Sequence, residues 1–207
     1  MSPVILPDSD TQPFKIDISN EAIEILQKKL ALATLPDELE GAGRDYGVPL
    51  ADVQRLLSRW KDGYDWRKYE KQLNDELPQF QKHIDVAGFD SLNIHYVYKK
   101  SEVEGAIPLL FVHGCECFGL TTAISVFNPF SNAGPGSFYE VRKILPLLTQ
   151  GATDEVSFHV VALSLPGYGF SEGSKRKGFA IGQYAEVRSC FTHLGLIQRI
   201  SPCTGRT

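Results

Sequence analysis

The sequence of 207 residues predicts an α/β protein in which helices cover a mostly parallel sheet. Two apolar runs, residues 107–112 and 159–163, have the length and composition of buried strands. Each is followed, after an intervening segment, by apolar residues at helical spacing, over residues 137–148 and 181–194. Because strands and helices alternate along this half of the chain, a parallel sheet between helical layers is expected.

The region before this alternation predicts an arm, an edge strand and a group of helices. Residues 1–13 are rich in proline and aspartate, which is typical of a loose arm, and residues 14–18 alternate like an edge strand. Ser19 then precedes apolar residues at helical spacing, so we expect it to be a helix N-cap. The predicted helices cover residues 20–33, 53–60 and 66–73. We interpret them as a wrap around the edge of a core.

Four aromatic residues gather in this predicted wrap, namely Trp60, Tyr64, Trp66 and Tyr69. They could form a cage around a substrate. Helical and turn spacing of aromatic residues more often serves to pack a core edge. We therefore expect packing side chains and not a binding site.

The spacing of apolar residues changes from helical to alternating at Gln79. Residues 80–86 and 92–98 predict a two-stranded hairpin that turns at residues 88–90. This hairpin completes an expected N-terminal domain, which precedes a partial α/β core. The predicted divisions are residues 1–13 for the arm, 14–106 for the N-terminal domain, 107–196 for the core, and 197–207 for a tail that matches nothing.

Composition excludes several classes of protein. With 43% hydrophobic residues and a net charge of -4, the chain predicts a soluble globular protein without the basic patch that nucleic-acid binding requires. No run approaches the roughly 20 apolar residues that span a bilayer, and residues 1–11 lack the order of a secretory signal. A cytoplasmic location is therefore expected. No metal is expected either, because Cys115 and Cys117 have the wrong spacing for a zinc site.

His113 and Gly114 directly follow the first predicted core strand. Taken alone, His113 indicates a turn histidine whose ring bonds nearby backbone groups. The alternative is an oxyanion loop, in which backbone N–H groups just past the strand face a developing negative charge. Further along, Ser137 and Glu140 have the spacing of a capping box that opens a helix. No histidine has the neighbours of a nucleophilic triad.

The succession of motifs along the chain resembles one family, the microsomal-type epoxide hydrolases. The N-terminal match spans residues 14–112 and resumes after residue 134. Its motifs are Tyr46-Gly47-Val48-Pro49, Trp60, Tyr64-Asp65-Trp66-Arg67, Leu73-Asn74, Pro78-Gln79-Phe80, Ile94-His95-Tyr96, Pro135-Gly136-Ser137-Phe138-Tyr139-Glu140 and Ser164-Leu165-Pro166-Gly167-Tyr168-Gly169-Phe170-Ser171.

The resemblance implies an α/β-hydrolase fold, here incomplete, with an N-terminal helical wrap. It also implies that the full-length family converts a small-molecule epoxide to a diol without a cofactor, a reaction of epoxide metabolism and detoxification. In that reaction an Asp nucleophile forms an ester, which a His-activated water then hydrolyses. By resemblance, the oxyanion loop comprises His113, Gly114 and Pro135. Gly167 and Gly169 are expected to give a loop beneath the active site its positive φ angles.

An insert separates the two halves of the expected oxyanion loop. Residues 115–133 fit no element, and the family has a tryptophan where this chain has Cys115. Permitted codons place an intron donor within Cys115 and an acceptor before the last two bases of Gly134; removing the intervening bases keeps the frame and creates a tryptophan codon. The hypothesis is a retained intron or a gene-model error. We expect the oxyanion loop to be disrupted, because a displacement of about 1 Å can lower a rate about a hundredfold.

The family's Gly-Gly-Asp-Trp nucleophile pattern is missing from the 207 residues, and residues 197–207 contain no acidic residue. The chain is therefore expected to be a fragment of an epoxide hydrolase and inactive alone. An alternative is a non-catalytic interaction protein that pairs with a full-length homologue, or with itself, through an exposed sheet edge. An esterase that uses Ser137 or Ser171 is weaker, because neither lies in a Gly-x-Ser-x-Gly elbow.

Overall fold

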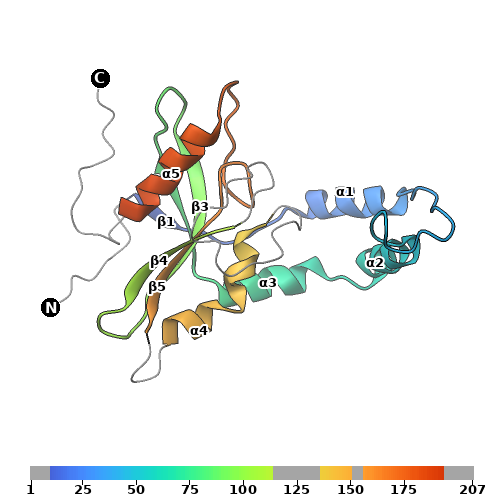
Figure 1. Ribbon diagram of the computed structural model, residues 1–207, viewed down its shortest axis with the longest axis horizontal. Coiled ribbons are helices and arrows are strands. Elements are labelled where there is room, and N and C mark those ends of the chain that lie inside the picture. Colours follow the sequence, from blue (N-terminus) through green and yellow to red (C-terminus); the bar gives the residue numbers. More distant parts are fainter. Residues whose placement is uncertain (1–9, 114–135, 151–155, 194–207) are drawn as a thin grey trace. The chain divides into compact units, whose positions relative to one another are not determined.

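The computed structural model describes residues 10–113, 136–150 and 156–193 (Figure 1). Gly114, Pro135, the insert and the C-terminal tail lie outside the described residues. The chain divides into two compact units. A helical unit covers residues 16–73, and a sheet unit combines residues 1–15 with 74–207.

The helical unit contains the three predicted helices. They are α1 (Asn20–Ala31), α2 (Leu50–Asp62) and α3 (Trp66–Glu76), the last of which continues into the sheet unit. The Ser19 side chain accepts a hydrogen bond from Ala22 N at 3.2 Å, which confirms the predicted N-cap. Helix α2 begins directly after Pro49, and Leu50 N donates to the Glu38 carboxylate at 2.8 Å. Cap and proline therefore fix where α1 and α2 start.

Glu70 is a buried carboxylate at the centre of hydrogen bonds within the helical unit. Its Oε1 accepts from Ile18 N at 2.7 Å and from Trp66 Nε1 at 3.1 Å, and its Oε2 pairs with Arg67 at 2.5 Å. Burial raises the pKa of Glu70, but the hydrogen bonds from Ile18, Arg67 and Trp66 outweigh it and leave the pKa below the usual value of 4.5. The charged carboxylate is thus the form that holds α3 to the segment before α1.

Replacing Glu70 with alanine is expected to lower the unfolding free energy of the helical unit by about 2 kcal/mol, because the partly buried Ile18 and Trp66 donors lose a charged, buried acceptor. The fluorescence of Trp60 and Trp66, both in this unit, measures this change during urea unfolding. Glu24→Ala is the control, since Glu24 is exposed and its loss should change the midpoint little. Equal effects of the two substitutions would contradict a structural role for Glu70.

The sheet has five strands in the order β1-β2-β3-β5-β4 in the described part of the chain. The strands are β1 (Thr11–Pro13), β2 (Gln79–Ile84), β3 (Leu92–Lys99), β4 (Ile107–Val112) and β5 (Phe158–Leu163). The hairpin of β2 and β3 is confirmed, with Gln79 opposite Val97 and Ile84 opposite Leu92. Strands β4 and β5 pair in parallel, whereas β3 pairs with β5 in the antiparallel direction. The sheet is therefore mixed.

Two sequence-based expectations, the edge strand and the loose arm, need correction. The edge strand lies at residues 11–13 and not at 14–18, so the predicted arm is already ordered there. Pairing stops after Phe14 because the chain then enters the helical unit, where Ile18 N bonds Glu70. The predicted domain of residues 14–106 stays a prediction, and the two compact units cut across it. Its hairpin belongs to the sheet unit, because β3 pairs directly with β5.

The predicted helix over residues 137–148 is split into two pieces. A 3₁₀ helix, η1 (Phe138–Arg142), opens with the predicted capping box of Ser137 and Glu140. Helix α4 (Leu145–Gln150) follows. The break has a local cause, because Pro146 lacks the N–H that a continuous helix would bond to the Arg142 carbonyl.

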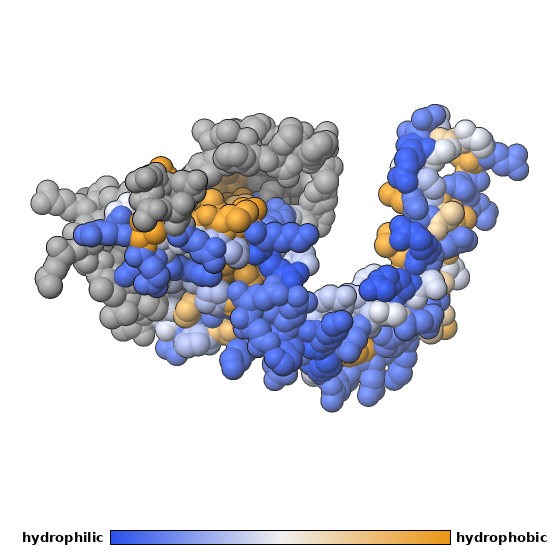
Figure 2. All heavy atoms as spheres, turned by 90° about the horizontal axis from the view of Figure 1, so that it is seen from below, coloured by the Kyte–Doolittle hydropathy of each residue, from blue (hydrophilic) through white to orange (hydrophobic). Residues whose placement is uncertain are grey.

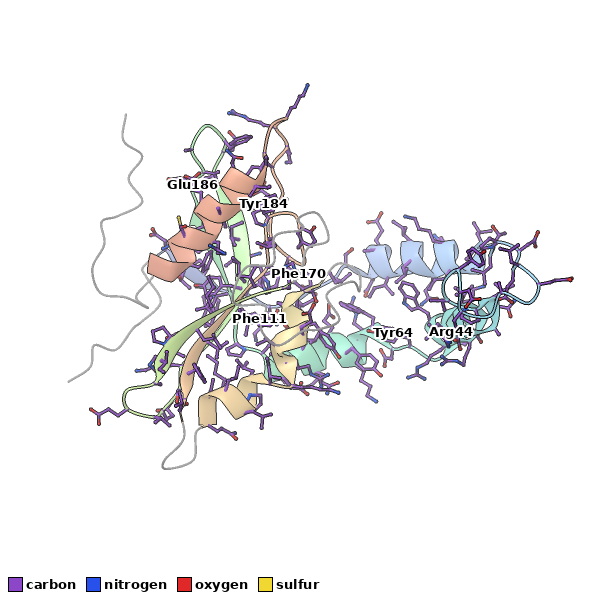
Figure 3. The ribbon with its side chains drawn as sticks, viewed as in Figure 1. Arg44, Tyr64, Phe111, Phe170, Tyr184 and Glu186 are labelled. Carbon is purple, nitrogen blue, oxygen red and sulfur yellow. The ribbon has the colours of Figure 1, made fainter. Side chains whose placement is uncertain are left out.

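The core of the sheet unit lies between the sheet and α5 (Ile181–His193). Alternate residues of β3, among them Ile94 and Tyr96, pack with Val187 and Phe191 of α5. Glu186 of α5 also accepts a hydrogen bond from Ala87 N in the β2–β3 connection at 3.0 Å (Figure 3). The opposite face of the sheet is covered by η1 and α4, with Val141 and Leu145 fully buried.

Within the described ranges, no helix combines the length and the apolar character needed to cross a membrane.

Candidate functional site

The motifs singled out in the core meet where β4 and β5 end. These strands run in parallel with Val112 opposite Leu163, so His113 and Ser164 follow at the same edge of the sheet. In open α/β sheets, ligands bind beyond the carboxyl ends of the parallel strands. This edge is therefore the candidate site.

The His113 ring is buried, with 3% of its surface exposed. Its Nε2 atom accepts a hydrogen bond from Leu165 N at 3.2 Å, and the ring lies 5.1 Å from that of Tyr168. A histidine bonded to backbone was one of the two interpretations of the sequence, and the structure shows it. The oxyanion role of the backbone beyond His113 stays a prediction, because Gly114 and Pro135 lie outside the described residues.

The loop after β5, residues 164–172, forms the floor of the candidate site, and we call it the floor loop. Gly167 and Gly169 have φ angles of 80° and 54°, as the sequence predicted. A Cβ atom on Gly169 would lie 3.1 Å from Ser164 Oγ and 3.4 Å from the Phe138 ring. Glycine is thus required at this position both by the backbone angle and by the space.

The floor loop is bonded to β3 along its length. Ser164 N donates to His95 O at 3.0 Å, and His95 N donates to Ser171 Oγ at 2.9 Å. Ser171 Oγ in turn donates to Ser164 O at 2.7 Å. At the end of the loop, Glu172 N donates to Asn93 O at 2.8 Å. The loop is therefore held as a fixed surface and not as a free connection.

His95 is the residue that the sequence interpretation missed. The sequence places it only in the strand of residues 92–98, whereas the structure shows that it is completely buried and that both ring nitrogens have partners. Nδ1 lies 2.8 Å from Ser164 Oγ, and Nε2 lies 3.1 Å from Gln79 Oε1. The only signal in the sequence is that His95 alternates with Ile94 and Tyr96 in an apolar strand. Its partners are distant in the sequence, so no local pattern could have found them.

Three phenyl rings surround the imidazole of His95 in edge-on geometry. The ring centroids of Phe14, Phe138 and Phe170 lie 5.1, 4.7 and 5.5 Å from it. Burial in this apolar shell lowers the pKa of His95 to about 4. The ring is therefore neutral at neutral pH.

Ser164, His95 and Gln79 have the spacing of a nucleophile, a base and an orienting group. Ser164 and His95 are both fully buried, however, so no substrate reaches the hydroxyl. The Ser171 hydroxyl accepts a hydrogen bond from His95 N and donates one to Ser164 O. Ser137 caps η1 by accepting from Tyr139 N at 3.2 Å. These contacts give the serines structural tasks and lend the esterase alternative no support.

The remaining described histidines lie away from this site. His83 is exposed on β2. His159 Nδ1 accepts from Ser101 N at 3.0 Å, and burial, followed by the charge of Lys100, lowers its pKa. Across the described part of the chain, no cluster of three or more His, Cys, Asp or Glu residues could hold a metal ion.

The predicted aromatic cluster lines a groove in the helical unit. Tyr64 and Tyr69 stack with centroids 4.7 Å apart, and Trp60 is 47% exposed. Trp60, Tyr64 and Trp66 border an open cavity of about 610 Å³ together with residues of α1 and α2. Figure 2 shows apolar side chains at the surface of this unit. That these aromatic residues wrap a core edge remains a prediction.

Comparison with known proteins identifies the fold and the family. The described fold is similar to the crystal structure of juvenile hormone epoxide hydrolase from the silkworm Bombyx mori, with a TM-score of 0.70 and 27% identity over 91% of this chain and 44% of that one. The mixed sheet covered by helices, with the site at the strand ends, is thus part of an α/β-hydrolase fold.

Residues 11–116 match the family model described as epoxide hydrolase N terminus. The chain is 35% identical to epoxide hydrolase 1 of Sus scrofa over 185 residues, which are 86% of this chain and 35% of that protein. It is 33% identical to juvenile hormone epoxide hydrolase 2 of Ctenocephalides felis over 184 residues, or 87% and 34%. The chain belongs to the epoxide hydrolase family, and it spans about a third of the length of these relatives.

Proposed function

We propose that this chain supplies the N-terminal part of an epoxide hydrolase, an enzyme that adds water to a small-molecule epoxide and releases a diol. The observation that carries the proposal is the meeting of His113, the floor loop and the start of η1 at one edge of the sheet. Family membership gives this edge its chemistry, since the relatives carry epoxide hydrolase names. The nearby backbone would stabilise developing negative charge.

The 207 residues are proposed to be inactive by themselves. The family mechanism requires an Asp nucleophile within Gly-Gly-Asp-Trp and a histidine that activates water, and this sequence contains no Gly-Gly-Asp-Trp. Positioning groups without a nucleophile cannot form the ester. The described residues then act as a scaffold that holds the floor and one wall of the site.

A chimera tests both the function and the insert. Residues 1–196 replace the equivalent part of the Sus scrofa relative, once with residues 115–134 intact and once with them replaced by a single tryptophan. The tryptophan chimera is expected to convert styrene oxide to its diol, measured by chromatography. The intact chimera is expected to be at least about a hundredfold slower, because the insert separates the two halves of the oxyanion loop.

Two controls make the result decisive. The 207-residue chain alone should form diol no faster than the epoxide hydrolyses in buffer without protein. In the tryptophan chimera, the nucleophilic Asp comes from the Sus scrofa part. Changing this Asp to Asn should abolish activity, which would show that the ester route is used. A folded tryptophan chimera without activity, or diol formation by the 207-residue chain, would refute the proposal.

One observation favours a second candidate function, a non-catalytic protein that pairs with a full-length homologue. Strand β4 ends the sheet in the described part of the chain, with β5 on one side only. Ile107 N donates toward β5, to Ser157 O at 2.8 Å, so the amides of Leu110 and Val112 point to the other edge. Such an edge can accept another strand. Hydrogen exchange would reveal protection of these two amides in a stable heterodimer, whereas a mixture that elutes as separate proteins counts against pairing.

A further inference from the structure

Two buried histidines, one in β3 and the other directly after β4, are connected through consecutive residues of the floor loop. His95 of β3 bonds Ser164 Oγ at 2.8 Å, and His113 after β4 accepts from Leu165 N at 3.2 Å. Strand β5, which leads into Ser164, lies between β3 and β4 in the sheet. The connection therefore crosses three neighbouring strands at the candidate site.

The partners of His95 fix the position of its proton. Gln79 Nε2 donates to Asn74 Oδ1 at 3.3 Å, which turns Gln79 Oε1 toward His95 Nε2 at 3.1 Å. An amide oxygen only accepts, so Nε2 of His95 carries the proton. Nδ1 of the neutral ring then accepts the hydroxyl proton of Ser164.

The proton of His113 is on the opposite type of nitrogen. A backbone amide only donates, so His113 Nε2, which accepts from Leu165 N, is unprotonated. The neutral ring therefore carries its proton on Nδ1. The structure thus holds the two histidines in opposite tautomers.

We propose that His95 is a positioning residue for His113. His95 orients the Ser164 hydroxyl, and the Ser164–Leu165 backbone in turn presents the amide that selects the His113 tautomer and ring orientation. The floor loop transmits this effect because Gly169 lets Ser164 and Phe138 close against His95. The consequence for catalysis rests on the proposed function, because His113 begins the expected oxyanion loop. The hydrogen-bond chain itself is independent of the proposed function.

Nuclear magnetic resonance of the 207-residue chain with 15N-labelled histidine tests the proposal. Long-range 1H–15N spectra at pH 7 distinguish protonated from unprotonated ring nitrogens. His95 is expected to show a protonated Nε2, and His113 a protonated Nδ1, each as a single tautomer. Finding either histidine in the other tautomer overturns the proposal without need of any variant.

The Ser164→Ala variant tests the coupling between the two rings. It removes the floor-loop hydroxyl that bonds His95 but keeps the Leu165 amide that bonds His113. The His113 signals are expected to shift and to show a second tautomer. Ser101→Ala is the matched control, because Ser101 is an equally buried serine bonded to Ser157 at 2.7 Å, away from His113, and should leave the His113 signals unchanged.

Unchanged His113 signals in folded Ser164→Ala would overturn the coupling. These spectra do not depend on turnover. An inactive chimera would therefore refute the proposed function and leave the hydrogen-bond chain standing, and the reverse also holds.

Discussion

Replacing His95 with alanine is expected to lower the unfolding free energy of the sheet unit by about 4 kcal/mol. The substitution removes a fully buried ring from a shell of three phenylalanines and leaves a cavity. It also leaves two buried groups, Ser164 Oγ and Gln79 Oε1, without their hydrogen-bond partner. Urea unfolding followed by circular dichroism measures the loss. His83→Ala is the control, because His83 is exposed on neighbouring β2, and a comparable loss in both variants would contradict this account.

The same histidine gives stability a defined dependence on pH. Burial lowers the pKa of His95 from 6.5 to about 4 in the folded chain. Above pH 6.5 the ring is neutral whether the chain is folded or unfolded, so stability is unaffected. Between pH 6.5 and about 4 the unfolded chain binds a proton that the folded chain does not, and stability falls by up to about 3 kcal/mol.

The His95→Gln variant isolates this effect, because glutamine cannot titrate and can still bond Ser164. The unfolding free energy of wild type minus that of His95→Gln is expected to decrease from pH 7 to pH 4. His113 and His159 are present in both proteins, so their contributions cancel. A difference that is constant with pH would show that His95 titrates as an exposed histidine does.

Replacing Gly169 with alanine is the second large change, with an expected loss of about 3 kcal/mol. A side chain at φ 54° costs on the order of 1 kcal/mol, and the new methyl group meets Ser164 Oγ at 3.1 Å and Phe138 at 3.4 Å. Crowding of this kind adds about 1–3 kcal/mol. The displaced atoms belong to the shell of His95, so the floor loop should also loosen, which amide exchange of Ser171 and Glu172 would report.

Gly88→Ala separates the strain of the backbone from the contact. Gly88 has a φ of 77°, and nothing lies within 4 Å of the Cβ it would gain. Its loss is expected to be about 1 kcal/mol, the backbone cost alone. If both alanine variants lose the same unfolding free energy, the floor loop accommodates a methyl group at Gly169 without a steric cost.

Local patterns in the sequence predicted most of the described elements. The cap at Ser19, the hairpin, strands β4 and β5, helix α5 and the capping box at Ser137 each depend on residues within one turn or one strand. Such patterns act over a few residues, which is why they are legible in a single sequence. The prediction of one helix over residues 137–148 missed a signal equally local, the proline at position 146.

The sequence by itself determined the family, the α/β class and the positive φ of Gly167 and Gly169, because these follow from ordered motifs and from residue types. Only the tertiary structure decided that β3 pairs with β5, that the hairpin joins the sheet unit, and that His95 is a buried node. Each of these depends on groups far apart in the chain, such as His95 and Ser164, 69 residues apart. Side chains and strands so distant select each other by packing and hydrogen bonding in the folded state, and no local spacing encodes that choice.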